Sequence, residues 1–531
     1  MEQTVEYLPY GDTGFFTKIV TDYLSQSPLV QPFFQHTPDF KGIEAAIDAR
    51  KAFSTDRSLL VEVLQAQYHH IPTSEKVKKN ILSLAGENTF TVTTAHQPNI
   101  FMGPLYFIYK ILHAVKLADE LTLQFPQYKF VPVYYMGSED ADLEELGFVN
   151  VGGQHLVWET KQTGAVGRMK VDKSLIKLIN AIQGQIGVLP FGNELTDIFK
   201  KCYSEGKTIQ KATLELTNQL FSNFGLVVLV PDNAKLKAAF ELVVSKELTE
   251  GFSHSIVAAT IASLKKNYKV QAGGREINLF YLIDDKRERI ELQGEKYEVR
   301  TLGIQFSKEE MLIELRKHPE RLSANVILRG AFQETILPNI AFIGGGGELA
   351  YWLELKNVFA AVEIPFPVLL LRNSFLLIKK EQSEKLLQLG FTHTDFFKDS
   401  FYLLNLLVKR ESENQLSLSK EIEQAHSYYS GLKKITGAVD ITLTEHVASL
   451  EKRAIIKLSE LEKKMLRAER NKYGTRQKQI EKLKKDLFPN NSLQERVDNF
   501  SLNYATYGTA WLQMIYDVST GLNKGFGVVT V

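Results

Sequence analysis

One stretch, residues 91–142, limits the fold of this chain more than any other. A β-branched run at residues 89–94 is typical of a buried strand, and a second apolar strand is predicted at 130–136, with an apolar helix between the two. Polar residues follow each strand at once, at positions 95–99 and 138–142. Ligands of open parallel sheets bind outside the carboxyl ends of the strands. The stretch therefore predicts a strand–helix–strand unit with a functional site at its carboxyl edge.

The alternation of strands and helices continues to about residue 376 and predicts an α/β fold built on a mainly parallel sheet. A helical lead-in is expected over residues 1–85, with inserted segments at about 150–218 and 235–320. The further elements predicted are strands at residues 225–230, 325–328, 340–343 and 367–371, a helix at 348–361, and a small antiparallel insert at 279–283 and 296–299 joined by a charged loop. Because 531 residues are too many for one core, we expect a first domain over residues 1–376.

The remainder, residues 377–531, has a different pattern. Val447, Ala454, Leu461 and Ala468 recur every seven residues, which predicts an amphipathic helix or helical hairpin of coiled-coil type over about 440–487. Lys and Arg outnumber Asp and Glu there, which indicates a solvated helix face or, alternatively, an anion-binding or dimer-facing one. The last residues, 527–531, are predicted to form an edge strand.

Composition excludes several classes of protein. The net charge of +1 favours neither nucleic acid nor a membrane surface as a partner. A single cysteine, Cys202, excludes an internal disulfide and a cysteine-based metal cluster. The first residues lack the basic and apolar regions of a signal peptide, and no apolar run is long enough to span a membrane. We expect a cytoplasmic protein.

The turn after the first strand contains His96, Gln97 and Asn99. Class I nucleotidyl-transfer enzymes carry an ATP-binding H-x-G-H signature at the same place, and imidazole or amide donors there stabilise phosphate charge. A lone histidine near a strand end is also often structural. The K-M-S-K-S loop of ordinary aminoacyl-tRNA synthetases is absent, so that chemistry is not expected.

An acidic cluster follows the second strand: Glu139, Asp140 and Asp142. It is suited to hold Mg²⁺, to accept a substrate ammonium or to supply a base. If the chain stays extended, the side chains of Asp140 and Asp142 point to the same face and need a cation between them. The alternative is that one of them only caps the next helix.

Four glycines at 344–347 follow the strand predicted at 340–343. Gly345, Gly347 and Glu348 belong to a G-x-G-x-x-A pattern between a strand and a helix, a turn that lets a ligand approach the backbone. No acidic residue follows about 20 positions later, which disfavours a nicotinamide dinucleotide.

Residues 94–106 resemble a signature of the bacillithiol-synthesis cysteine-adding enzymes, the BshC family. The other similar segments are 131–142, 277–281, Leu328-Arg329 with Gln333, 343–348 with Tyr351, 493–496 and 507–508. The resemblance spans nearly the whole chain in the family's order. The chain departs from it at His96, Asn99, Met102 and Ala141, where the family usually carries Gln, Gly, Gly and His, and at 525–527, where it usually carries a His.

The resemblance implies a Rossmann-like core with inserted connecting segments, a C-terminal coiled-coil domain and a homodimer. It implies a ligase that joins L-cysteine to the amine of glucosaminyl malate, with ATP-dependent activation of the carboxylate and Mg²⁺ as a candidate ion. The residues assigned on this basis are His96, Asn99, Glu139, Asp140 and Asp142 for catalysis, Gln97, Gly103, Ser138, Arg329, Gln333 and Tyr351 for substrate, and Gly345, Gly347 and Glu348 for nucleotide. The alternative is a coiled-coil scaffold on an inactive α/β core that binds a partner or nucleic acid.

Overall fold

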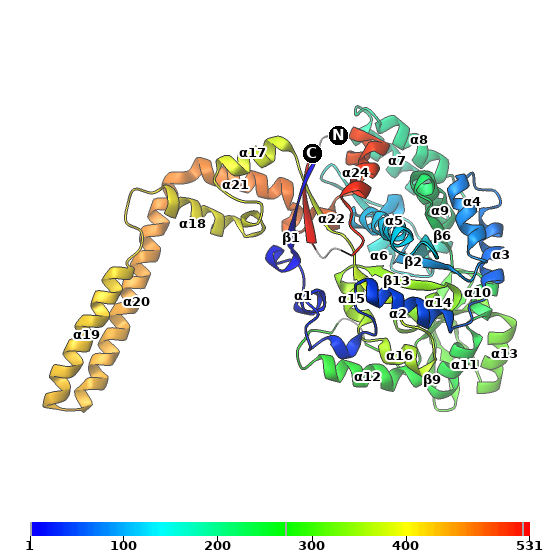
Figure 1. Ribbon diagram of the computed structural model, residues 1–531, viewed down its shortest axis with the longest axis horizontal. Coiled ribbons are helices and arrows are strands. Elements are labelled where there is room, and N and C mark those ends of the chain that lie inside the picture. Colours follow the sequence, from blue (N-terminus) through cyan, green and yellow to red (C-terminus); the bar gives the residue numbers. More distant parts are fainter. Residues whose placement is uncertain (1–2, 271–272, 523–524) are drawn as a thin grey trace.

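The computed structural model describes residues 3–270, 273–522 and 525–531. Its centre is a five-stranded, wholly parallel sheet in the order β14-β13-β2-β3-β6 (Figure 1). The strands are β2 (Thr89–His96), β3 (Lys129–Met136), β6 (Val227–Leu229), β13 (Asn339–Gly344) and β14 (Val368–Leu371). All five end at the same edge because they are parallel. The predicted α/β parallel architecture is confirmed.

The central unit runs from β2 through helix α5 (Tyr106–Gln124) to β3, as predicted. Phe90 and Val92 alternate with Thr91 along β2, and they pack with Ala114 and Leu117 of α5. Helix α2 (Phe40–Lys51) adds Ile43 and Ile47 to the same apolar cluster. One face of the sheet is therefore covered by α5 and α2 together.

The remaining helices before the second sheet surround this core. They are α1 (Lys18–Leu24), α3 (Arg57–Tyr68), α4 (Glu75–Ser83), α6 (Leu143–Leu146), α7 (Lys173–Ile186), α8 (Gly192–Cys202), α9 (Ile209–Phe221), α10 (Ala234–Ala238), α11 (Glu241–Glu250), α12 (Phe252–Leu264), α13 (Lys308–Lys317), α14 (Val326–Ile336), α15 (Gly346–Trp352) and α16 (Lys356–Ala361). The strand predicted at 325–328 is wrong, because Asn325 caps α14 by accepting a hydrogen bond from the Ile327 N–H at 2.9 Å. The helix predicted at 348–361 is broken into α15 and α16, so that Trp352 and Phe359 both pack on Phe366.

The predicted antiparallel insert consists of two small sheets. Strands β12 (Leu322–Ala324), β7 (Leu279–Ile283) and β8 (Lys286–Arg289) form one, and β11 (Ile304–Phe306), β10 (Lys296–Val299) and β9 (Glu291–Gln293) form the other. The predicted charged loop is wrong, since strands β8 and β9 occupy most of it. A separate hairpin joins β4 (Phe148–Val151) and β5 (Gln154–Val157).

A second sheet joins the two ends of the described chain. Its order is β1-β16-β15, with β1 (Thr4–Pro9) antiparallel and β15 (Phe375–Ile378) parallel to β16 (Gly525–Thr530). The lead-in is therefore not wholly helical, and the final strand is the centre of its sheet rather than an edge. The helical lead-in is confirmed apart from β1, and the final strand is confirmed, but its predicted edge position is wrong, because the strands that pair with it lie far away in sequence.

The C-terminal part is mainly helical: its long helical hairpin extends away from the core as an arm, whereas its last helices return and pack on the core (Figure 1). Its helices are α17 (Lys380–Gln388), α18 (Ser400–Glu411), α19 (Ser419–Val439), α20 (Thr442–Arg470), α21 (Gly474–Leu487), α22 (Gln494–Val497), α23 (Ser501–Tyr507) and α24 (Thr509–Val518). The hairpin of α19 and α20 begins at Ser419, earlier than the sequence pattern indicated. None of the helices in the described ranges combines the length and apolar character that crossing a membrane requires.

Candidate active site

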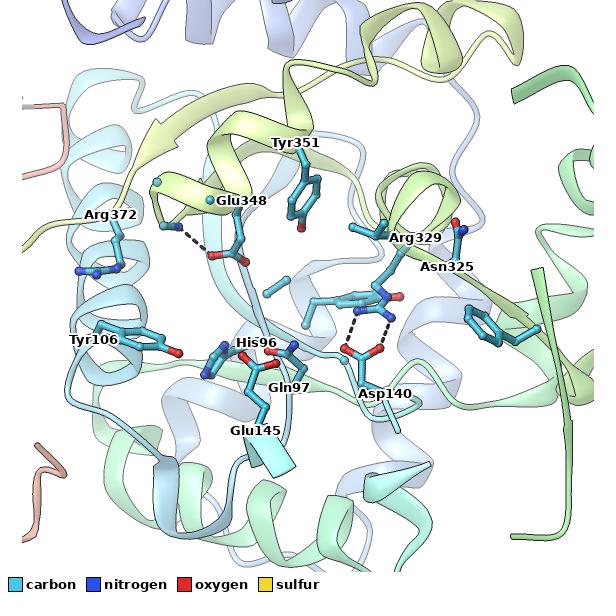
Figure 2. A pocket seen from close by; sticks show the side chains of 18 of the residues that line it. His96, Gln97, Tyr106, Asp140, Glu145, Asn325, Arg329, Glu348, Tyr351 and Arg372 are labelled. Carbon is cyan, nitrogen blue, oxygen red and sulfur yellow. Dashed lines mark hydrogen bonds and ion pairs between the residues drawn. The ribbon is translucent and has the colours of Figure 1, made fainter. Parts of the chain in front are cut away.

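A cavity of about 750 Å³ opens at the carboxyl edge of the parallel sheet (Figure 2). This volume falls in the range of small-molecule sites. The lining residues are Ala95, His96, Gln97, Tyr106, Tyr135, Gly137, Asp140, Glu145, Gly273, Arg275, Phe280, Arg287, Asn325, Val326, Arg329, Gly345, Gly346, Gly347, Glu348, Tyr351, Arg372 and Arg496. Polar residues that follow β2, β3, β13 and β14 thus converge on one space, as the parallel topology predicts.

His96 ends β2 and is buried against the rings of Tyr106 and Phe107, with centroid distances of 5.3 and 4.6 Å. Burial, together with the positive charges of Lys110 and Arg372, holds the pKa of His96 well below its ordinary value. Its Nε2 has no hydrogen-bond partner among the described residues. The imidazole is therefore neutral, and one of its nitrogens is available to a ligand.

Asp140 and Arg329 form a bidentate ion pair within the cavity, with one Nη1–Oδ2 distance of 2.9 Å. Burial by itself raises the pKa of the Asp140 carboxyl, but the charge and hydrogen bonds of Arg329 and a hydrogen bond from Gln97 outweigh it and lower that pKa. Asp140 therefore stays ionised and orients the guanidinium of Arg329. Tyr351 of α15 lies on the same wall.

Glu348 closes the glycine turn after β13. Its carboxylate accepts a hydrogen bond from the Gly345 N–H at 2.7 Å and pairs with buried Lys110 at 2.6 Å. A Cβ placed at Gly347 would meet open space. The turn therefore presents backbone to the cavity beside a carboxylate that already has its cation.

Arg372 follows β14 directly and reaches across to the C-terminal part of the chain. Its Nη2 donates to Glu495 of α22 at 2.7 Å, and its guanidinium lies 5.1 Å from the ring centroid of Tyr106. The next residue of α22, Arg496, lines the cavity. The site is thus completed by a segment more than one hundred residues beyond the parallel sheet.

Three cavity arginines have no anionic partner in the described ranges: Arg275, Arg287 and Arg496. Burial and the charge of Arg329 lower the pKa of Arg287 to about 10, which still leaves it charged at neutral pH. Its guanidinium stacks 3.8 Å from the ring centroid of Phe280. Unpaired guanidiniums suit carboxylate or phosphate ligands.

The acidic cluster does not act as one group, and the prediction that Asp140 and Asp142 share a face is wrong. The chain turns after Ser138, and exposed Asp142 caps α6 by accepting a hydrogen bond from the Glu145 N–H at 3.1 Å. Glu139 points away from the cavity, where it pairs with Lys237 and accepts a hydrogen bond from Ser323. No group of three His, Cys, Asp or Glu side chains suited to a metal occurs in the part of the chain that is described.

Four other predicted residues lie outside the cavity lining. Asn99 and Gly103 shape the turn, because Gly103 has a φ of +57° and a Cβ there would lie 2.8 Å from the Asn99 Cβ. Ser138 is buried, and its carbonyl accepts a hydrogen bond from the Gly167 N–H at 2.9 Å. Gln333 is buried on α14 and donates to Glu334 at 2.9 Å.

Sequence reasoning missed Tyr106, Glu145, Asn325 and most of the arginines. Arg372 directly follows a predicted strand, so the rule that selected His96 and Asp140 would have selected it too. Tyr106 lies within the signature at 94–106. Arg275, Arg287 and Glu145 carry no local signal, since tertiary structure alone brings them to the sheet edge.

Comparisons with known proteins match the whole described chain. Residues 3–373 match a family model described as the bacillithiol biosynthesis BshC N-terminal Rossmann-like domain, and residues 375–531 match the corresponding C-terminal coiled-coil domain. A protein of Flavobacterium johnsoniae named "Putative cysteine ligase BshC" is 39% identical over 99% of both chains. Proteins of the same name from Flavobacterium psychrophilum and Cytophaga hutchinsonii are each 37% identical, over 98% and 93% of both chains. The Rossmann-like and coiled-coil parts of the predicted fold are thereby confirmed.

Proposed function

The chain belongs to the bacillithiol biosynthesis BshC family, and on that premise we propose that it joins the carboxyl group of L-cysteine to the amine of glucosaminyl malate. The product is an amide, formed in the last step of bacillithiol synthesis. The observation that carries the proposal is the charge of the cavity, where Arg275, Arg287 and Arg496 form no ion pair within the described chain. Such a site suits substrates with several carboxylate or phosphate oxygens.

The substrates can be assigned to parts of the cavity. Arg275 and Arg287 line the cavity from the inserted segment, Arg287 close enough to Arg329 for their charges to interact, and both are suited to the two carboxylates of malate. His96, Gln97 and Asp140 follow β2 and β3. In Figure 2, His96 and Gln97 lie between Arg329 on one side and Arg372 on the other, and Asp140 lies beside Arg329. We place the reacting carboxyl of cysteine there, where the free His96 Nε2 is available as a hydrogen-bond partner.

ATP is the proposed source of activation, because an amide does not form spontaneously from a free carboxylate in water. The cavity fits a nucleotide: Gly345 and Gly347 allow close approach, and Arg372 and Arg496 are suited to phosphate. ATP, when bound, would supply a good leaving group to the carboxylate. Any Mg²⁺ would enter with the phosphates, since the described residues offer it no ready-made cluster.

Reconstitution tests this function. Purified protein with L-cysteine, glucosaminyl malate, ATP and Mg²⁺ is expected to form the amide, detected by mass spectrometry, and omission of any one organic reactant should abolish it. Release of ADP or of AMP identifies the activating group. Arg287→Met should raise the KM for glucosaminyl malate, whereas the exposed Arg316→Met should not. In cells, intact bacillithiol after deletion of the gene, without accumulation of glucosaminyl malate, would contradict the proposal if no second copy exists.

We further propose a cytoplasmic homodimer. Apolar side chains exposed along the arm support the dimer, among them Ile435 at 65%, Val439 at 79% and Ile441 at 76% exposure. Sedimentation of the full chain tests it.

The alternative of a scaffold on an inactive core is disfavoured because polar residues from four strand ends converge on one cavity. Salt-dependent binding of nucleic acid by residues 451–487 would support that alternative, and the absence of binding at about 50 mM salt would rule it out.

A further inference from the structure

The carboxylates that line the cavity are not equivalent. Asp140 is neutralised by Arg329, and Glu348 by Lys110. Glu145 is the third, and no cation in the described ranges pairs with it. Only its backbone is engaged: the N–H donates to Asp142, and the carbonyl accepts a hydrogen bond from Asn99 at 3.3 Å. The fold therefore fixes the position of Glu145 and leaves its carboxylate to a ligand.

The surroundings of Glu145 favour a proton. Its partial burial and the negative charges of Asp142 and Asp140 raise the pKa of its carboxyl above the ordinary value. In Figure 2 its side chain points toward His96 and Gln97, in the middle of the cavity. Neutral His96 supplies no positive charge, so the cavity has one unpaired carboxylate, which lies between Arg329 on one side and Arg372 on the other in Figure 2.

We infer that Glu145 binds the ammonium group of the amine substrate and takes its proton as the amide forms. The inference rests on the proposed ligase function. An aliphatic amine is largely protonated near neutral pH and is not a nucleophile in that form. The ammonium nitrogen loses two protons on the way to the amide. Glu145 takes the first, which frees the lone pair that attacks the activated carboxyl carbon. As the N–C bond forms, the bond from carbon to the phosphate leaving group breaks, the leaving group keeps that electron pair, and the second proton passes to the departing phosphate. Asp140 cannot take this role because Arg329 keeps it ionised and occupied.

The test separates the amine step from carboxylate activation. Hydroxylamine is uncharged at neutral pH and traps activated cysteine as a hydroxamate without needing a base. Glu145→Gln is expected to lower amide formation at least about 100-fold, the usual contribution of a positioned general base, while hydroxamate formation stays within about twofold. Glu145→Asp should recover part of the amide activity. Glu144→Gln, an exposed carboxylate on the same short helix, is the matched control and should leave both rates unchanged.

Two outcomes with the Glu145 variants would overturn the inference. Equal loss of amide and hydroxamate formation, with a raised KM for cysteine, would assign Glu145 to the cysteine ammonium. Unchanged amide formation would remove it from the mechanism. A wild-type protein that forms hydroxamate but no amide with glucosaminyl malate, or neither product, instead contradicts the proposed function, and the two failures are thereby distinguishable.

Discussion

The ion pairs within the core around the parallel sheet and those within the helical arm differ in how far apart in sequence their partners lie. In the core, Arg329 pairs with Asp140 across 189 residues, and Lys110 with Glu348 across 238. In the arm, Glu451 pairs with Lys433 across 18 residues and with His426 across 25. The core pairs are buried or half-buried, whereas α19 buries none of its side chains.

This difference has an energetic consequence. A buried charge that loses its partner keeps its desolvation cost, whereas a charge in water is solvated again. Substitutions of paired charges in the core should therefore change stability or activity strongly, by an amount that depends on the partner residue. Substitutions in the arm should change stability little, through their effect on local helix formation. Four predictions test this contrast.

The largest effect is expected at Arg50, which is 1% exposed and pairs at 2.7 Å with Glu334, 0% exposed. Arg50→Met leaves the Glu334 carboxylate buried without its cation, and should lower the free energy of unfolding by about 3–5 kcal/mol in urea titrations. Adding Glu334→Leu should recover much of that loss. Lys433→Met in the arm is the matched control, and an equal loss there would contradict the contrast.

Acid should weaken the core through His113. Its Nε2 lies 2.8 Å from the Gly521 carbonyl, its Nδ1 accepts a hydrogen bond from the Asn373 N–H, and burial lowers its pKa from 6.5 to about 4. As the pH falls, His113 is protonated in the unfolded chain before it is protonated in the folded one. The contribution of neutral His113 to the free energy of unfolding is therefore fully present above about pH 6.5, and about 3 kcal/mol of it is lost as the pH approaches 4. Unfolding at several pH values should show a shallower acid slope in His113→Gln than in wild type.

A smaller effect is expected on activity at the sheet edge. Asp140→Asn removes the charge that orients Arg329, and should lower turnover at least about tenfold, equivalent to about 1.4 kcal/mol. The exposed helix cap Asp142→Asn should retain near wild-type turnover at saturating substrates. Similar losses in both variants would show that the two carboxylates act together after all.

The smallest effect is expected in the arm, at Gly431. A Cβ there meets nothing within 4 Å, and the residue lies inside α19. Gly431→Ala should stabilise the helix by about 0.5–1 kcal/mol and slow amide hydrogen exchange within it. Gly103→Ala is the core counterpart and should destabilise the protein, because its positive φ and the contact with Asn99 exclude a side chain.

The same contrast explains what could be predicted from the sequence. The unit from β2 to β3 and the helices of the arm follow from periodicity within a short window. The apolar run at 325–328 is too short for its periodicity to distinguish a strand from a helix. The segment is helical because the Asn325 side chain caps the start of α14. Strands β1 and β15 were not found, because β16, which pairs with both, lies far away in sequence.

The site divides in a similar way. Residues directly after a predicted strand, such as His96, Asp140 and Glu348, were found because topology alone brings strand ends together. Gln333 was selected because it belongs to a segment that resembles the family, but its position one turn of α14 after Arg329 directs it into the buried hydrogen bonds around Glu334. Arg287 reaches the cavity only through the packing of an inserted segment, and Glu145 only through the turn that leads from β3 into α6; no local pattern records either placement.

The pairing of β1 with β16 also determines when, during synthesis of the chain, their sheet can form. Strand β1 pairs with β16, and Tyr7 donates a hydrogen bond to the Val518 carbonyl, 511 residues later. A ribosome adds about 5–20 residues per second, so β1 waits roughly 25–100 s for its partner to be made. Throughout that interval a nascent chain presents an unpaired strand edge, the kind of surface that chaperones shield and that aggregates recruit. Synthesis of β16, rather than collapse of the Rossmann-like core, is then the event that completes the second sheet.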